Sequence, residues 1–485
     1  MLVLAAPLWA ACGSSGAKSG KGVDAIGNAA DGGIGADGSA AGGLADGATS
    51  DSAVGGGDAG SSGNDDAGEG GLVGDSTGTL AVRNNDFLDS MGVCVHVAQG
   101  VDSPSQSATA LSYAGIRNIR DDGNPAVVTD WIAMHQSAGV HVDVLSNQNV
   151  SSTIGMATQL NDAGALLAVE GPNEPNNFPV TYEGQTSSST SFVPVADFQR
   201  DLYAAVKADS SLMGIPVFHS SEAGGSEPNN VGLQFLTIPD DAGTLMPAGT
   251  QYADYGNIHN YVCGHSNDLV DNAAWNASDP TLNGDWDGLY VEYGHTWNGG
   301  FAGYSDADLT TLPRVTTETG WLTMGTGAIT EEQQARVFLD LYLSAFKRGF
   351  AYTFIYMLRD DPVQGYWGLF DTSYNAKTSG TYVHNLTTIL ADTGARAPDK
   401  LNYSVVGEPA TVHDLLLQKS DGTFDLIVWD ERLTGGTDSV TVDLVTSRAT
   451  VTIYDPTTGT SPTQTLTDVS SVTLTLSDHP VVLTL

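Results

Sequence analysis

Basic residues are scarce in this chain of 485 residues: 18 Lys and Arg face 57 Asp and Glu, and the formal net charge is −39. A protein that binds nucleic acid needs a Lys- and Arg-rich surface to meet the phosphate backbone. The composition therefore argues against nucleic acid as a partner. The acidity indicates a well-solvated surface and gives no reason to expect a cationic substrate.

Cysteine is also rare, with single residues at Cys12, Cys94 and Cys263. The sequence has no Cys and His spacing of the kind that holds zinc, and it predicts neither a metal nor another cofactor. Cys94 and Cys263 fall on the first and sixth strands of the barrel predicted below, which are not neighbours. We therefore expect two buried thiols and no disulfide between them.

A long apolar run is missing from the N-terminus, where the apolar residues 1–12 are too few to span a bilayer as a helix. They end in small residues before Cys12 and resemble the end of a bacterial lipoprotein signal, although a basic segment is absent. We expect an exported protein that is lipidated at Cys12 and touches a membrane only through this anchor. An ordinary secretory signal and a truncated start are the alternatives.

Aromatic residues are absent from residues 13–78, which consist mostly of Gly, Ala, Ser and Asp. Such a segment buries too little apolar surface to offset the entropy of ordering it. We interpret it as a disordered linker with a mean reach of about 40–50 Å.

Residues 79–397 alternate short apolar strands with amphipathic helical stretches. Eight strands are expected, at 90–97, 115–122, 140–145, 165–169, 215–222, 255–261, 314–318 and 351–357. Helices are expected at 107–114, 126–138, 153–162, 194–208, 330–348 and 380–392. This α/β pattern predicts a (β/α)8 TIM barrel. A doubly wound open sheet would also alternate, but no Gly-rich phosphate motif follows the first strand.

Residues 398–485 change to period-two alternation of apolar and polar side chains. The clearest strands are 415–418, 424–429, 439–442, 449–454 and 472–476. We predict a small β-sandwich that packs on the barrel as structural support, with glycan binding as the alternative.

Two glutamates stand where predicted strands end. Asn173-Glu174-Pro175 follows strand four, and Glu318 ends strand seven within Arg314-Val315-Thr316-Thr317-Glu318-Thr319-Gly320-Trp321. The carboxyl ends of barrel strands meet at one face, so the two side chains can face each other across its mouth. Hydrolysis of a glycosidic bond uses such a pair of carboxyl groups. A helix-capping turn is the structural alternative for residues 173–175.

These motifs resemble clan A of the retaining glycoside hydrolases, which includes families 5 and 39, over about residues 86–395. The resemblance implies that Glu174 is the acid/base and Glu318 the nucleophile of a double displacement, with carboxyl groups about 5–5.5 Å apart. Asn173 would hydrogen-bond the sugar 2-hydroxyl. We expect burial and the nearby Glu318 to raise the pKa of Glu174, which would keep it protonated at rest.

The resemblance extends to His259-Asn260-Tyr261 and to Arg120. It implies that Tyr261 hydrogen-bonds Glu318, that His259 contacts the substrate or the acid/base, and that Arg120 lies near the nucleophile. The alternatives are a buried His, a core Tyr and an ion pair of Arg120 with the adjacent Asp residues.

Other residues at strand ends are weaker candidates. For His96, Asn147 and Glu222 the sequence favours neither of two roles, lining the cleft or supporting loops. The candidate aromatic platforms for sugars are Trp321 and Trp367, with core packing as the alternative. The Trp that the clan carries after strand eight is not evident, because residues 356–359 read Tyr-Met-Leu-Arg. Two rival carboxyls are Glu170, for which we prefer a buried polar role, and Glu292, in the insertion after strand six.

The sequence thus predicts an exported, monomeric, retaining glycoside hydrolase that cleaves a β-linked polysaccharide or oligosaccharide. The linker and the long loops favour endo action on a polymer. A non-catalytic surface glycan-binding protein on a decayed barrel is the alternative from another class. A transglycosylase or a lyase on the same scaffold is a third. The glycan itself is not identified by the sequence.

Overall fold

The computed structural model describes residues 78–188, 191–223, 236–238, 240, 246–264, 268–282, 286, 288–289 and 305–485. The predicted signal at 1–12, with the lipidation site Cys12, lies outside these residues. Nearly all of the predicted linker and the rival carboxyl Glu292 also lie outside them. No helix among the described residues is long and apolar enough to cross a membrane.

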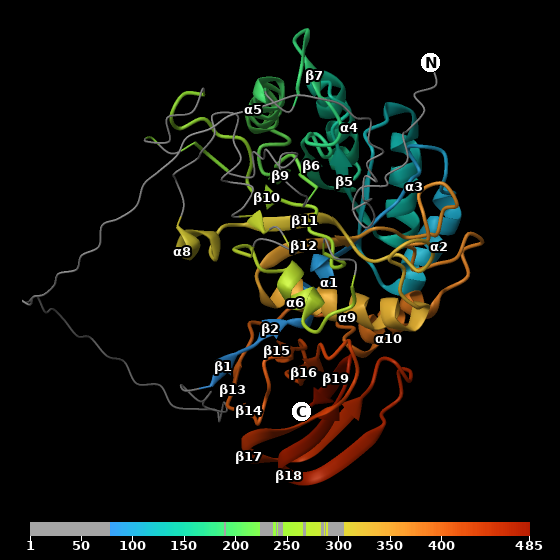
Figure 1. The fold of residues 1–485 in the computed structure, drawn as a ribbon, viewed down its shortest axis with the longest axis vertical. Helices are drawn as coiled ribbons and strands as arrows, with labels where there is room; N and C mark the ends of the chain where they lie inside the picture. The colour runs from blue at the N-terminus through green and yellow to red at the C-terminus, as the bar shows by residue number, and fades with distance from the viewer. Residues whose placement is uncertain are drawn as a thin grey trace, which may run out of the picture. The chain divides into compact units, whose positions relative to one another are not determined.

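The centre of the fold is a parallel sheet of eight strands in the order β10-β11-β12-β3-β4-β5-β6-β9 (Figure 1). Parallel bridges from Phe218 to Tyr255 and from Ala223 to His259 join the two outer strands. These bridges close the sheet, so the predicted (β/α)8 barrel is confirmed. In chain order the strands are β3 (Met91–Cys94), β4 (Asn118–Asp121), β5 (His141–Leu145), β6 (Leu166–Glu170), β9 (Val217–Phe218), β10 (Gly256–Asn257), β11 (Arg314–Thr319) and β12 (Phe350–Ile355).

Six helices follow strands of the barrel and match the predicted ones closely: α2 (Pro104–Ala114), α3 (Val128–Ala138), α4 (Val150–Asp162), α5 (Val193–Ala208), α9 (Glu331–Lys347) and α10 (Thr378–Ile389). Thr330 and Gln333 form the capping box that starts α9. Gly115 and Gly139 end α2 and α3 in the left-handed conformation, which a residue without a Cβ adopts most easily. Shorter elements are α1 (Asn84–Ser90), η1 (Pro125–Val127), α6 (Ala273–Ala277), α8 (Asp306–Leu309) and the hairpin of β7 (Thr181–Tyr182) and β8 (Gln185–Thr186).

The C-terminal domain is built from one bent sheet in the order β14-β17-β19-β16-β15-β2, with β18 paired to β17. Its strands are β14 (Ser404–Val406), β15 (Val412–Gln418), β16 (Phe424–Asp430), β17 (Asp438–Tyr454), β18 (Gln464–Leu476) and β19 (Pro480–Thr484). The register of β17 and β18 shifts between Asp443 and Arg448, and there the long hairpin bends. The strands of this sheet bury apolar side chains in one core, which includes Leu426, Val451, Leu474 and Leu483. The strands predicted at 439–442 and 449–454 are thus the two halves of β17.

Strand pairing joins residues 79–83, at the predicted start of the barrel, to the C-terminal strands. β2 (Val82–Arg83) pairs in parallel with β15, and β1 (Thr79–Leu80) pairs with β13 (Lys400–Leu401). Residues 79–83 therefore belong to the C-terminal domain. Figure 1 shows this segment in blue beside the orange and red strands.

Polar contacts fasten the C-terminal domain to the barrel. Asn84 Nδ2 donates to Asp425 Oδ2 at 2.7 Å, and Ser344 Oγ donates to Glu431 Oε1 at 2.6 Å.

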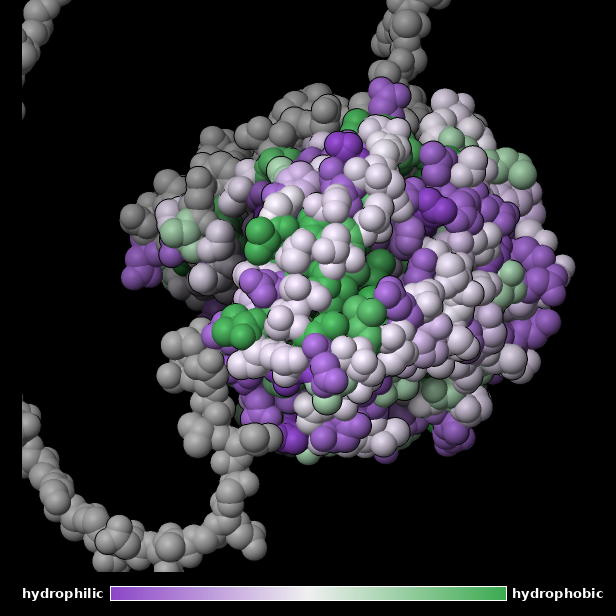
Figure 2. Space-filling view, turned by 90° about the horizontal axis from the view of Figure 1, so that it is seen from below, coloured by the Kyte–Doolittle hydropathy of each residue, from purple (hydrophilic) through white to green (hydrophobic). Residues whose placement is uncertain are grey.

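Figure 2, which views the protein from below, shows an apolar patch surrounded by hydrophilic residues. The alternation of exposed and buried residues along β17 and β18 accounts for a mainly polar outer surface on these strands.

Candidate active site

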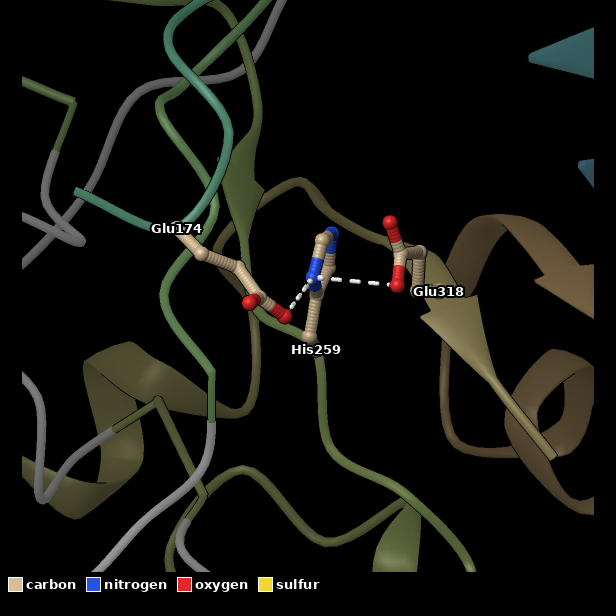
Figure 3. Close-up of side chains that lie close together, drawn as sticks. All are labelled: Glu174, His259 and Glu318. Atoms are coloured by element: carbon tan, nitrogen blue, oxygen red, sulfur yellow. Dashed lines mark hydrogen bonds and ion pairs between the residues drawn. The ribbon is translucent and has the colours of Figure 1, made fainter. Parts of the chain in front are cut away.

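Glu174 and Glu318 reach the same point from opposite sides of the barrel mouth (Figure 3). Glu318 lies in β11, and Glu174 follows β6 by four residues. A carboxylate oxygen of one lies within 4.8 Å of a carboxylate oxygen of the other, and the side chains are almost fully buried. This separation is close to the value of about 5–5.5 Å that serves a nucleophile and an acid/base, and shorter than the roughly 6.5–9.5 Å of inverting enzymes.

The backbone after β6 turns sharply to place Glu174. Asn173 forms a parallel bridge with Ser221, and Glu174 then takes a φ of 38°, in the left-handed region. Non-glycine residues with such a φ are uncommon and concentrate at functional sites. Asn177, three residues later, donates from Nδ2 to Glu174 Oε2 at 3.0 Å and fixes the carboxyl group.

His259, which follows β10, lies between the two carboxyl groups (Figure 3). Its Nδ1 is 2.8 Å from Glu174 Oε1 and 3.7 Å from Glu318 Oε2. Its Nε2 is 2.9 Å from Thr317 Oγ1. His259 was expected to contact either the substrate or the acid/base, and in the structure it contacts Glu174, the proposed acid/base.

The pKa of Glu174 is shifted in the direction opposite to our expectation. Burial raises it, but the hydrogen bond and charge of His259 outweigh burial, with help from Asn177 and Arg120, and the net effect lowers the pKa. A hydrogen bond to the ionised form of a carboxyl group favours that form. The expectation that Glu174 is protonated at rest is therefore wrong at neutral pH, because the sequence did not reveal the hydrogen bond from His259.

Glu318 is held by two donors from other strands. Arg120 Nη1 donates to Glu318 Oε1 at 2.6 Å, and Tyr261 Oη donates to Glu318 Oε2 at 2.8 Å. Both contacts were expected, while their roles in a reaction stay predictions. Burial and the charge of Glu318 raise the pKa of Tyr261, so its hydroxyl keeps the proton that it donates.

Arg120 also joins Glu318 to β6. Its Nε and Nη2 donate to the two oxygens of Glu170 at 2.6 and 2.9 Å, and Nη2 donates to Asn173 Oδ1 at 2.7 Å. The predicted buried polar role of Glu170 agrees with this placement. Among the described residues, Arg120 bonds Glu170, Glu318 and Asn173 and not the alternative partners Asp121 and Asp122. Asp121 accepts from Trp131 Nε1 instead.

Aromatic side chains border the carboxyl groups on one side. The Trp367 ring packs edge-to-face on Tyr261 and on Tyr356, with centroids 5.4 and 6.1 Å apart. His96 packs edge-to-face on Tyr356, with ring centroids 5.5 Å apart. Tyr356 follows β12 and is joined to Met357 by a cis peptide bond. Through Tyr261, Trp367 lies one contact from Glu318, while the roles of Trp367 and His96 toward a sugar stay predictions.

Three other predicted site residues make no hydrogen bond to Glu174 or Glu318 among the contacts of the described residues. Trp321 is fully buried in the core and donates from Nε1 to Gly327 O at 2.7 Å, so its predicted role as a sugar platform is wrong. Asn147 bonds Ser152 and Thr153 and supports the start of α4. Glu222 is fully buried, and its backbone carbonyl accepts the N–H of His259 at 2.8 Å.

Sequence reasoning missed Thr317, Asn177 and Tyr356. Neighbours in a strand normally face opposite sides, which hid Thr317 beside Glu318. The pairing of β11 with β12 has a register shift between Thr316 and Thr319, and this irregularity lets both side chains reach the site. Asn177 could have been found from the sequence, because a residue three positions after Glu174 in a turn can reach the Glu174 side chain.

Glu174, His259 and Glu318 are also the one set of side chains in the described ranges whose atoms are close enough to hold a metal ion together. Both oxygens of Glu318 already accept hydrogen bonds, and both nitrogens of His259 have partners. The arrangement therefore suits proton transfer and nucleophilic attack better than metal binding. Cys94, which is free and buried, donates to Thr317 O at 3.2 Å and is not bridged to Cys263.

Solved glycoside hydrolases share this fold. A glucosidase from Croceicoccus marinus is 12% identical, with a TM-score of 0.51 over 85% of this chain and 97% of that one. A GH39 β-xylosidase from Caulobacter crescentus is 12% identical, with a TM-score of 0.50 over 84% of this chain and 98% of that one. No family model and no curated protein matches the sequence. At this identity the likeness shows the fold alone and does not assign the chain to a family.

Proposed function

We propose that the protein is a retaining glycoside hydrolase in which Glu318 is the nucleophile and Glu174 the acid/base. The observation that carries the proposal is the pair of buried carboxyl groups with oxygens within 4.8 Å, each held by its own set of donors. Arg120 and Tyr261 each donate a hydrogen bond to one oxygen of Glu318 and fix its orientation. This short separation supports a retaining mechanism over an inverting one, which places a water between the two groups.

In the first step Glu318 attacks the anomeric carbon while Glu174 gives its proton to the glycosidic oxygen. The bond from carbon to the leaving oxygen breaks, and a glycosyl ester with Glu318 forms. In the second step the ionised Glu174 takes a proton from water, the water oxygen bonds the anomeric carbon, and the ester bond breaks. His259 lowers the pKa of Glu174, so the fraction of enzyme ready for the first step grows as the pH falls. We expect an acidic optimum.

The substrate that we propose is a β-linked polysaccharide or oligosaccharide cleaved internally. Retention through a nucleophile at this position follows from the resemblance to clan A, and Trp367 and Tyr356 supply aromatic surface beside the reacting groups. Export and lipidation at Cys12 are a further proposal, supported by the sequence before that residue. Replacing Cys12 by Ser should abolish incorporation of labelled fatty acid in cells; equal labelling of the variant would contradict it.

The test is turnover on a panel of β-glucans, xylans, mannans and galactans with analysis of the products. Glu174→Gln and Glu318→Gln remove one catalytic group each and keep the size of the side chain. Glu331→Gln, at an exposed position in the first turn of α9, is the matched control. We expect each site variant to lose at least about 1,000-fold in kcat/KM, which is about 4 kcal/mol of transition-state stabilisation. Near-normal turnover by either one contradicts the assignment.

A further inference from the structure

Two carboxyl groups buried beneath the proposed catalytic pair take no part in these steps. Glu170 ends β6 and Asp143 lies in β5, and both are fully buried. The oxygens of Glu170 accept hydrogen bonds from Arg120 Nε and Nη2 at 2.6 and 2.9 Å. They also accept from Thr317 Oγ1 at 3.0 Å and from Asn257 Nδ2 at 3.2 Å. A carboxylate with this many donors has one defined orientation.

Arg120 connects Glu170 to the reacting groups. Two more of its N–H bonds point to Glu318 Oε1 at 2.6 Å and to Asn173 Oδ1 at 2.7 Å. The guanidinium group is planar and rigid, so its paired hydrogen bonds with Glu170 set the direction of these other two. A misplacement of about 1 Å at a reacting atom can cost about 100-fold in rate. Glu170 is therefore placed to control where Glu318 stands.

Asp143 completes this cluster as a neutral acid. Neither of its oxygens accepts a hydrogen bond from any part of the chain that the structure describes. Burial and the charge of Glu170 raise the pKa of Asp143 well above its usual range. Burial opposes ionisation of Glu170 too, but the charge and hydrogen bonds of Arg120 lower its pKa. Arg120 thus faces two carboxylates and one neutral acid.

We propose that Glu170 is a positioning residue for the nucleophile, and that protonated Asp143 is its buried hydrogen-bond donor. Glu170 fixes the Arg120 guanidinium against Glu318 and Asn173, and it takes part of the charge of Arg120. The carboxylate of Glu318 is then held in one place for attack on the anomeric carbon. This inference rests on the proposed function, since it assigns Glu170 a role in that reaction.

The test compares Glu170→Gln with Asp143→Asn on a glycan that the wild type cleaves. The first variant removes a negative charge, so Arg120 acts on Glu318 alone. The acid limb of kcat/KM, where the nucleophile takes up a proton, should move down by about one pH unit. We expect kcat to fall about 100-fold while KM changes less than about 3-fold. Asp143→Asn keeps a neutral donor to Glu170, so its acid limb should stay within about 0.3 pH unit.

A purely structural role for Glu170 would lower stability without moving the acid limb. Circular dichroism and melting curves show whether each variant is folded. Difference infrared spectra of the wild type and Asp143→Asn at neutral pH should show a protonated carboxyl band that only the wild type has. If Glu170→Gln does not fold, the infrared spectra and the pH profile of Asp143→Asn test the proposal in its place.

Three outcomes would overturn the proposal: an unmoved acid limb in folded Glu170→Gln, a limb shift of similar size in Asp143→Asn, or no protonated carboxyl band. The proposed function is judged separately. It stands if the wild type cleaves with retention and Glu318→Gln does not, whatever Glu170→Gln does. It falls, and this inference with it, if Glu318→Gln remains active.

Discussion

Replacing His259 by Phe should move the alkaline limb of the pH profile upward. In the structure the hydrogen bond from His259 Nδ1, at 2.8 Å, and the charge of His259 favour ionised Glu174 against the effect of burial. Phe keeps a ring of similar size but has no donor. Burial then acts with less opposition, and the pKa of Glu174 rises.

The size of the shift follows from the strength of such a contact. A hydrogen bond to a charged group contributes about 1.5–3 kcal/mol, and about 1.4 kcal/mol corresponds to one pH unit. The proposed acid works when protonated, so the alkaline limb of kcat/KM reports its pKa in the free enzyme. We therefore expect this limb to rise by about 1–2 pH units in the variant, even though kcat at the optimum falls.

The assay is the pH dependence of kcat/KM for the wild type, His259→Phe and a matched control, His413→Phe. His413 lies in β15 and stacks on Trp275, away from the barrel mouth. Its replacement should leave both limbs in place. An alkaline limb that stays fixed or moves to lower pH in His259→Phe would refute the reasoning about Glu174.

Two further predictions concern single contacts. Tyr261→Phe removes the 2.8 Å hydrogen bond to Glu318 and should lower kcat/KM about 30-fold, which corresponds to about 2 kcal/mol. The control Tyr382→Phe loses a contact with Glu332 on α9 and should leave kcat/KM unchanged. Equal effects of the two substitutions would contradict the role of Tyr261. Burial raises the pKa of Glu431 to about 7, so its contribution to stability is present below the unfolded pKa of about 4.5 and is lost as the pH rises through 7. Relative to wild type, Glu431→Gln should therefore gain about 3 kcal/mol in unfolding free energy between about pH 4 and about pH 9, and denaturation curves without such a gain would show that the carboxyl group is not buried in this way.

Local patterns made most of the barrel predictable. The apolar periodicity and the caps of α9 and α3 depend on neighbouring residues, and the predicted helices begin and end within about three residues of the observed ones. The pairing of β2 with β15 joins residues more than 300 positions apart, and no local pattern contains that information. The strands β9 and β10 are shorter than the predicted ones, with two residues each in regular pairing. Beyond these residues, isolated bridges close the barrel.

The candidate site was predictable as a set of residues but not as a network. Asn173, Glu174 and Glu318 could be found from the ends of strands. The direction of the pKa shift of Glu174 depends on His259 from another strand, and strand positions alone do not give side-chain distances. Trp321 misled the prediction because Gly320, with a φ of 146°, turns the chain so that the indole enters the core.

The central claim is that Glu318 attacks the anomeric carbon and Glu174 transfers protons. Azide rescue of Glu318→Ala and Glu174→Ala, with an activated β-glycoside of the glycan that is cleaved, tests both roles in one experiment. Azide can replace a missing nucleophile by a single displacement, which inverts the anomeric centre, or replace water in the second of two displacements, which retains it. We predict an α-glycosyl azide from Glu318→Ala and a β-glycosyl azide from Glu174→Ala, identified by NMR. The reverse pattern, or no azide product from either variant, would contradict the account.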